Sequence, residues 1–154
     1  MSVDMKVDEA IVKQLTRKFK KFEEKITDQS LIEFVAERIK SNIFTRTNAG
    51  VDVNFTAFKP YSKEYAAAEK KTIVNLTQTG GMLNEMIQKT LSNDTAKIFF
   101  MTEKSRILAD KHNNIGVGSR RIIRQFFGVN IRDEVEAQKT YIQAIKKAKE
   151  DVGL

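Results

Sequence analysis

Residues 49–86 constrain the fold of this chain most strongly, because regular helical spacing stops where they begin. This stretch holds the only proline, Pro60, and three of the seven glycines, Gly50, Gly80 and Gly81. Apolar residues recur at helical spacing before it, and a strand-like run and a polar loop follow it. The expected fold class is therefore α+β: long N-terminal helices, short central helices, a small antiparallel sheet or hairpin, and a C-terminal helix.

Two amphipathic helices are expected before this stretch. In the first, over residues 7–26, successive apolar residues lie three or four positions apart, which places them on one face. They are Val7, Ile11, Leu15, Phe19, Phe22 and Ile26. Lysines and arginines occupy the other faces, so this helix could lie on a membrane, pack on its own domain or pair with a partner helix. Asp8, Glu9, Glu23 and Glu24 interrupt the basic charge and argue against the membrane.

The second helix is separated from the first by a short break. It is expected to begin at a capping box formed by Ser30 and Glu33 and to end near Phe44. From this organisation we predict that residues 1–27 are an N-terminal extension and that residues 28–154 form a single domain.

The middle of the chain is expected to be irregular. In residues 45–59 the helical periodicity is lost and apolar residues alternate with polar ones, as in a strand or an extended arm. Ser62 is a suitable N-cap for a short alanine-rich helix over residues 63–71. A turn rich in threonine and glycine, residues 77–81, then indicates entry into another short amphipathic helix over residues 82–90.

The C-terminal half begins with a predicted buried strand, residues 95–102, preceded by a Ser-Asn-Asp turn. A hairpin turn at residues 103–104 is expected to lead to a partner strand over residues 106–109. A polar loop that contains glycine follows at residues 111–121, and then an apolar anchor at residues 124–129.

The last helix is expected to begin at a capping box of Asp133 and Glu136 and to run to Gly153. Its inward-facing stripe is expected to consist of Val135, Gln138, Ile142 and Ile145, with Tyr141 beside it.

Residues that usually carry catalysis or bind metals are scarce. The chain has no cysteine and one histidine, His112, which excludes thiolate metal sites and leaves a nucleophilic triad at most one base. We expect His112 to be a solvated loop residue. Residues 116–119 superficially suggest a phosphate-binding glycine loop, but the Lys-Ser/Thr ending of a P-loop is missing. We therefore expect no enzymatic activity, cofactor or metal; a small hydrolase that uses helix carboxylates remains an alternative.

No run approaches the roughly 20 apolar residues needed to cross a bilayer, and the N-terminal residues lack the apolar core of a signal peptide. A cytoplasmic protein is the default expectation.

Positive charge is concentrated in one segment. The chain has a net charge of +7, and residues 101–132 carry seven basic and two acidic side chains. The most prominent basic residues there are Arg120, Arg121, Arg124 and Arg132. They could contact nucleic-acid phosphates, meet an acidic protein surface or form a solvated face, and the sequence leaves these alternatives open.

Three short stretches, taken in order, resemble a known family. They are FKPYSKEY (residues 58–65), LTQTGGML (residues 76–83), and the HNNIG and RQFFGV segments that begin at His112 and Arg124. Their order and spacing are similar to those of the virion morphogenesis proteins of tailed bacteriophages, which complete the tail and join it to the head. The chain departs from the family pattern in lacking tryptophan and in having Leu108-Ala109 where the family has a Tyr-Ala pair.

The resemblance implies a structural subunit without enzymatic activity. Such subunits form a homo-oligomeric ring at the phage neck or the head-proximal end of the tail, which joins the portal or its adaptor to the tail around the DNA channel. They are assembled in the host cytoplasm and reside in the virion. The alternative that stays open is a soluble accessory protein that binds nucleic acid without sequence specificity.

The resemblance also assigns roles to two segments. Lys111, Arg120, Arg121 and Arg124 are expected to face either the DNA in the channel or an acidic adaptor surface. The arm over residues 45–59 and the hairpin and loop over residues 104–121 are expected to contact neighbouring subunits or rings. The candidate residues of the intersubunit arm are Val51, Val53, Phe55, Phe58, Pro60 and Tyr61.

Overall fold

The structure is a computed structural model and describes residues 9–70, 73–76 and 81–154. In chain order the elements are α1 (Glu9–Ile26), α2 (Gln29–Asn48), α3 (Lys63–Ala68), α4 (Gly81–Asn84), β1 (Met86–Thr90), β2 (Ala96–Phe100), α5 (Glu103–Asp110), the π-helical turn η1 (Lys111–Ile115) and α6 (Ile131–Asp151). This order confirms the α+β fold class, with long N-terminal helices, a two-stranded hairpin, short central helices and a C-terminal helix.

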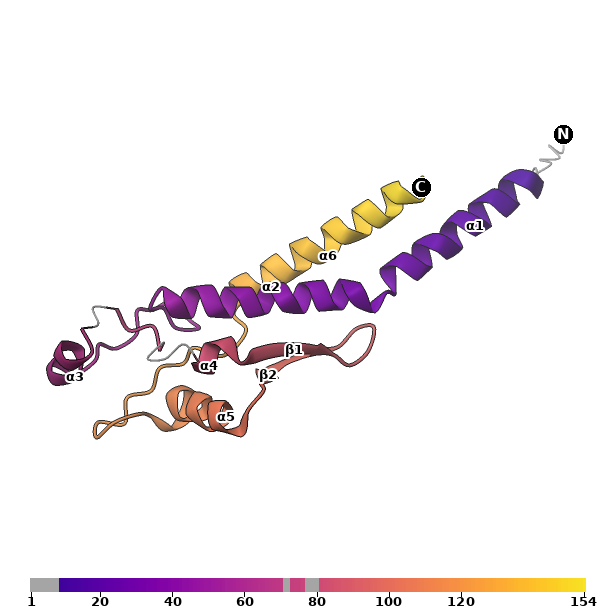
Figure 1. The fold of residues 1–154 in the computed structure, drawn as a ribbon. Coiled ribbons are helices and arrows are strands. Elements are labelled where there is room, and N and C mark those ends of the chain that lie inside the picture. The colour runs from indigo at the N-terminus through magenta and orange to yellow at the C-terminus, as the bar shows by residue number, and fades with distance from the viewer. Residues whose placement is uncertain (1–8, 71–72, 77–80) are drawn as a thin grey trace.

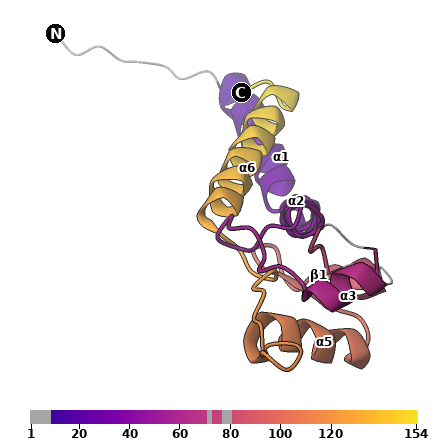
Figure 2. The ribbon, with the colours of Figure 1, turned by 90° about the vertical axis from the view of Figure 1, so that its left-hand side faces the viewer.

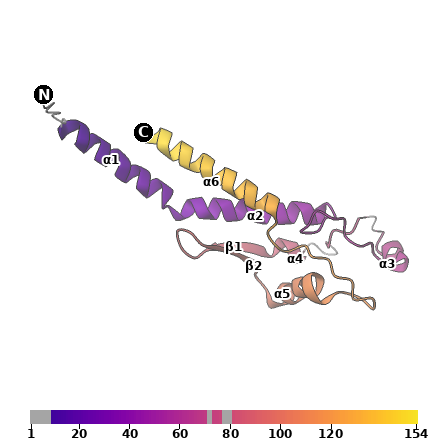
Figure 3. The ribbon, with the colours of Figure 1, turned by 180° about the vertical axis from the view of Figure 1, so that it is seen from behind.

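The elements form layers on either side of the hairpin. The helix α2 lies along one side of β1 and β2, and α5 lies on the other side (Figure 1). At one end of α2 the helices α1 and α6 run outward together, whereas α3 and the loop before α6 lie at the opposite end (Figures 1 and 3). Seen along α2, the molecule is a stack from α6 through α2 and the hairpin to α5 (Figure 2).

The break between α1 and α2 is made by Asp28, which adopts an extended conformation and accepts a hydrogen bond from the Ser30 amide at 2.9 Å. The predicted capping box at Ser30 is therefore wrong, because the carboxylate two residues earlier caps the helix first. Of the first helix, Glu9–Ile26 is described; the expected start at Val7 lies outside the described residues.

The helix α2 continues past the predicted end at Phe44 and stops at Asn48. Its last turn is held because Arg46 and Thr47 are buried against other elements. The helix ends where Gly50 adopts a φ of 79°, and a Cβ at that position would lie 3.0 Å from Ile73 and 3.2 Å from the Val74 carbonyl. Glycine suits this position because it tolerates both the left-handed backbone and the close approach.

Strands β1 and β2 pair antiparallel, from Met86 opposite Phe100 to Thr90 opposite Ala96. A strand is present where one was predicted over residues 95–102, but it is shorter, Ala96–Phe100, and of its residues Phe100 is buried. The predicted Ser-Asn-Asp turn lies in the hairpin turn. The helix predicted over residues 82–90 is wrong beyond α4, because five of these residues form β1. Short apolar runs fit both helical and strand periods, and here the ladder to β2 decided the outcome.

The partner strand predicted over residues 106–109 is also wrong, because this segment is helix α5. Thr102 caps α5, with its hydroxyl accepting a hydrogen bond from the Ser105 amide, and Ser105 and Ala109 face inward one turn apart. The alanine-rich helix α3 begins after Ser62 as predicted and ends at Ala68, short of the expected residue 71. Of the expected turn over residues 77–81, residues 77–80 lie outside the described residues.

The capping box of α6 consists of Asn130 and Asp133, three residues before the predicted one. Asp133 cannot serve as the N-cap because its carboxylate is buried and bound to Arg46 at 2.5 Å. Arg46 also donates to the carbonyls of Phe126 and Gly128. This buried ion pair joins the end of α2 to the start of α6.

The ion pair belongs to a polar row between α2 and α6. Arg38, Asn42 and Arg46 lie four residues apart on one face of α2. Arg38 and Asn42 both bind Glu136, and Asn42 also donates to Asp133. The hydrogen bond from Arg38 is the main reason that the pKa of Glu136 is held below its usual value.

The apolar core lies between α2, the hairpin, α5 and the segment before α6. Phe126 is completely buried at its centre and packs near Phe100 with ring centroids 6.1 Å apart. The core consists of Ile43, Phe58, Val74, Leu76, Met82, Leu83, Met86, Phe100, Ala109 and Phe126. The predicted apolar anchor over residues 124–129 therefore does enter the core.

Candidate functional site

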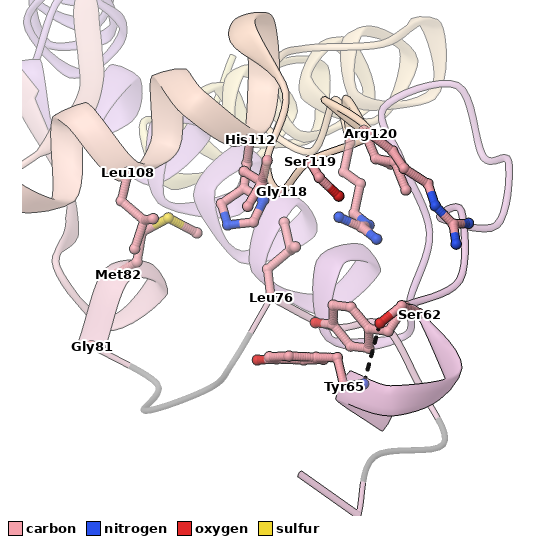
Figure 4. A pocket seen from close by; sticks show the side chains of 14 residues that line it. Ser62, Tyr65, Leu76, Gly81, Met82, Leu108, His112, Gly118, Ser119 and Arg120 are labelled. Atoms are coloured by element: carbon pink, nitrogen blue, oxygen red, sulfur yellow. Dashed lines mark hydrogen bonds between the residues drawn. The ribbon is translucent and has the colours of Figure 1, made fainter. Parts of the chain in front are cut away.

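A pocket of about 390 Å³ lies at the end of the molecule opposite α1, where α3, α4, α5 and the loop of residues 116–122 meet. We call this loop the basic loop. In Figure 4, Met82 and Leu108 line one side of the pocket, and Gly118 and Ser119 lie across from Ser62 and Tyr65. The lining residues are Tyr61, Ser62, Tyr65, Leu76, Gly81, Met82, Leu108, His112, Val117, Gly118, Ser119, Arg120, Ile122 and Arg124.

The three stretches that carry the family resemblance all reach this pocket. The first contributes Tyr61 and Tyr65, and the second contributes Leu76 and Met82. The third contributes His112 together with Arg124. Tyr61 and Arg124, 63 positions apart in sequence, are thus brought to one concave site, which sequence spacing alone did not indicate.

The side chain of Arg124 lines the pocket and is buried, so it does not face outward as a free cation. Its side chain donates to the carbonyls of Lys59 and Pro60 at 3.0 and 3.3 Å, and its guanidinium carbon lies 5.0 Å from the Tyr61 ring centroid. Burial lowers its pKa, and only 5% of the residue is exposed. The expectation that Arg124 meets DNA or an acidic adaptor therefore needs correction, because its donors hold the turn before α3.

His112 is partly buried, not a solvated loop residue as expected. It lies in the π-helical turn that continues α5, and its carbonyl accepts a hydrogen bond from the Arg124 amide at 2.8 Å. Burial, with Arg124 nearby, lowers the pKa of His112 to about 4, so the imidazole is neutral near pH 7. Its Nδ1 is buried and has no hydrogen-bond partner among the described residues.

The basic loop is a narrow turn closed by an antiparallel bridge between Val117 and Ile122. Gly116 is required there, because a Cβ would lie 2.3 Å from the Arg121 carbonyl oxygen and the φ is 93°. Arg120 and Arg121 are exposed at its tip. Lys111, at the start of the π-helical turn, is exposed as well. These three side chains are free to meet a partner, and their predicted role stays a prediction.

The segment expected to be an extended arm folds back on its own chain. Val51 bridges Ala57, and Asp52 accepts from the amides of Asn54 and Thr56, which makes a tight turn. The Val53 amide donates to the Gln125 carbonyl at 2.7 Å.

The exposed part of this segment consists of residues 54–57 together with residues 59 and 60. Phe58 is in the apolar core, so its assignment to an intersubunit arm needs correction. Tyr61 is half-buried and packs on Tyr65 at 4.8 Å between ring centroids. Phe55, which lies 3.9 Å under the guanidinium of Arg132, and Pro60 are exposed, and their contacts with neighbouring subunits remain a prediction.

The apolar stripe of α1 is largely left uncovered by the other described elements. Ile11 is 54% exposed and Phe19 is 58% exposed, and no described residue of α1 is buried. The helix is held to α6 by polar contacts, from Lys18 to the Gly153 carbonyl at 2.7 Å and from Lys25 to Asp151 at 2.9 Å. These contacts leave the first two turns of α1 projecting (Figures 1 and 3).

The stripe predicted to face inward on α6 is also largely exposed. Val135, Tyr141 and Ile142 are about two-fifths to half exposed, whereas Ala148 in the C-terminal turns is buried. Of the predicted inward stripe, Ile145 is half-buried, but Val135 and Ile142 are exposed because the first turns of α6 meet α2 through the polar row. A series of polar residues at spacing four, Arg38, Asn42 and Arg46, was the sequence signal for that contact.

No protein family, curated protein or solved structure matches this chain. None of the described helices combines the length and apolar content needed to span a bilayer. The division into residues 1–27 and 28–154 stays a prediction.

Proposed function

We propose that this protein is a structural virion subunit of a tailed bacteriophage. It forms a homo-oligomeric ring at the neck or the head-proximal end of the tail, and this ring joins the portal or its adaptor to the tail around the DNA channel. The proposal takes its identity from the ordered stretches that resemble the virion morphogenesis family, and its localisation is the virion after assembly in the host cytoplasm.

The observation that supports the proposal most directly is apolar surface left exposed on two helices. Phe19 and Leu15 of α1 and Ile142 of α6 are large apolar side chains exposed to solvent. A helix that is amphipathic but unburied in its own chain has its apolar face available to another chain, and exposed apolar surface of this kind commonly marks a protein interface. Repeated contacts between unlike faces of identical subunits form a ring when the rotation between neighbours closes, and a filament when it does not.

The exposed cations Lys111, Arg120 and Arg121 support a second, charge-directed contact. They belong to η1 and the basic loop, which follow α5 at the end of the molecule away from α1 (Figure 1), so the apolar and the cationic surfaces can engage different neighbours. In a ring around DNA, such cations meet either the phosphates or an acidic adjoining protein.

Light scattering together with negative-stain microscopy tests the proposal. We expect rings, or a monomer that becomes a ring when phage portal or tail components are added. A stable monomer with tight, salt-sensitive DNA binding and no affinity for such components would instead favour the nucleic-acid-binding accessory protein, because phosphate contacts release counterions.

The double variant Arg120→Glu and Arg121→Glu sharpens this test. Both side chains are exposed, so reversing them should weaken assembly or DNA binding while leaving the thermal unfolding midpoint within a few degrees of the parent. The variant Lys63→Glu and Lys70→Glu is a matched control, since it reverses two exposed cations outside the basic loop. Equal losses in both variants would assign the effect to net charge alone.

A further inference from the structure

The pocket beside the basic loop has the chemistry of a binding site. Its floor is apolar, with Leu76, Met82, Leu108 and Ile122, and Arg120 is the exposed cation that lines it. Among the described residues that line it, none is an aspartate or a glutamate. Glu64 on α3 lies within electrostatic range of Arg120 but does not line the pocket. The site therefore favours a group that is apolar and carries a negative charge.

We propose that this pocket binds an apolar side chain flanked by a carboxylate, presented by a segment of a partner protein. This inference rests on the proposed function, since a neighbouring virion subunit is the source of that segment. The volume of about 390 Å³ is near the lower end of the roughly 300–1,000 Å³ typical of ligand sites, which suits one or two side chains.

The polar residues of the pocket suit an apolar side chain flanked by a carboxylate. The imidazole of His112 lines the pocket and is neutral near pH 7, so it adds no charge beside the apolar floor. Arg120 can pair with the flanking carboxylate at the mouth. Arg124 already donates to two carbonyls, so its guanidinium is held in place and contributes a fixed positive charge at the side of the pocket.

The aromatic residues argue against a nucleobase in this pocket. Base stacking needs an open ring face. Tyr61 and Tyr65 pack on one another at 4.8 Å, and the guanidinium of Arg124 lies over the Tyr61 ring. The guanidinium thus competes with a base for the Tyr61 ring, whereas the aliphatic floor remains available to an apolar side chain.

The single histidine makes a direct test practicable, because the imidazole of ¹⁵N-labelled full chain gives one set of NMR signals. The probes are acetyl-Asp-Leu-Phe-Asp-amide, its counterpart acetyl-Lys-Leu-Phe-Lys-amide, sodium dodecanoate and an oligothymidylate of eight nucleotides. We expect a saturable shift of the His112 signals with the acidic peptide, at a dissociation constant on the order of 1 mM, and none with the basic peptide.

Three variants locate the binding. Arg120→Ala should weaken the acidic peptide by about fivefold, the size of one exposed ion pair, whereas Arg121→Ala removes an equal charge one residue away and should change it less than about twofold. Ser119→Trp should block the pocket mouth and abolish the shift. Retained amide dispersion and unfolding temperature would show that each variant is folded.

Several outcomes would overturn the inference. They are equal shifts by both peptides, equal effects of Arg120→Ala and Arg121→Ala, or a shift caused only by dodecanoate or only by the oligonucleotide, which would assign the pocket to a free amphiphile or to nucleic acid. No shift with any probe would also contradict it. Ring assembly is scored separately by microscopy, so a protein that assembles but does not bind the acidic peptide refutes the pocket inference alone.

Discussion

Helices α1 and α2 are neighbours in sequence, yet only α2 buries its side chains. The apolar residues of α1 follow a regular stripe, but Leu15 and Phe19 are exposed; α2 has the less regular pattern and buries Val35 and Ile43. The difference arises because α2 lies along the hairpin, whereas α1 runs beyond it and touches α6 through polar groups (Figure 1). An amphipathic stripe thus predicts a helix and an apolar contact, but not whether that contact lies within the same chain.

The largest effect is expected at the buried cation of α2. Arg46→Ala should lower the free energy of unfolding by about 3–5 kcal/mol, because it leaves the buried carboxylate of Asp133 without its partner. Arg17→Ala removes an exposed cation of α1 and should cost less than about 0.5 kcal/mol. Urea unfolding followed by circular dichroism measures both. Similar losses would contradict the contrast between the two helices.

The next effect compares apolar residues of the two helices. Ile43→Ala should cost about 2–5 kcal/mol, since Ile43 is 1% exposed and its truncation leaves a cavity. Phe19→Ala should cost at most about 0.5 kcal/mol in the monomer, because little of its side chain is covered.

Sedimentation velocity completes this comparison. If the stripe of α1 serves a partner, Phe19→Ala should reduce self-association or ring formation, whereas Ile43→Ala at temperatures where it stays folded should reduce it less. Intact assembly of the Phe19 variant would remove α1 from the interface.

A smaller effect depends on pH and concerns the opposite end of the molecule. The folded state holds the pKa of His112 at about 4, below its usual 6.5. The unfolded chain therefore binds more protons between these values, and stability is complete above pH 6.5 and lost as the pH falls toward 4. The parent should lose unfolding free energy between pH 7 and pH 4.5, and His112→Gln should make this loss smaller by about 1–2 kcal/mol. The expected change is less than the full pKa shift would give, because solvent contact screens the charge.

Unfolding of the parent and the variant at both pH values checks this expectation. Parallel pH profiles would show that His112 is equally basic in the folded and unfolded chains. The control Lys13→Gln changes an exposed side chain of α1, away from the pocket, and should leave the pH profile unchanged.

The smallest effect lies at the junction of the two helices. Asp28→Ala removes the cap of α2 and should cost about 1 kcal/mol, whereas Asp28→Asn should cost a few tenths because an amide oxygen also accepts from the Ser30 amide. Hydrogen exchange should show faster exchange in the first turn of α2 in the alanine variant. Unchanged exchange there would mean that packing, not the cap, sets the start of α2.

The sequence predicted structure correctly where only one local pattern, such as a helix cap or a strand-like run, fitted the residues. Ser62 predicted the start of α3, and the run before Phe100 predicted β2. Predictions were wrong where two local signals were close in strength. Residues 86–90 fit both periods, and the ladder to β2 made them a strand. The sequence pattern places Thr102 at the end of a strand, but in the fold this residue is the cap of α5.

The candidate site shows the same division. The three stretches around Tyr61, Leu76 and His112 were singled out in the sequence, but only the fold showed that they line one pocket. Arg124 was grouped with Arg120 because both are basic and close in sequence. In the fold one is buried against two carbonyls and the other is exposed, since their separation of four residues spans the end of the bridged loop.

By itself the sequence determined the α+β class, the amphipathic character of α1 and the scarcity of histidine and cysteine, because these depend on composition and on spacing within one element. The tertiary structure decided which apolar faces are covered, which arginines are buried and where the pocket lies. These depend on contacts between residues far apart in the chain, such as Arg46 with Asp133 and Arg124 with Lys59, and their free energy exceeds the local preferences that sequence patterns report.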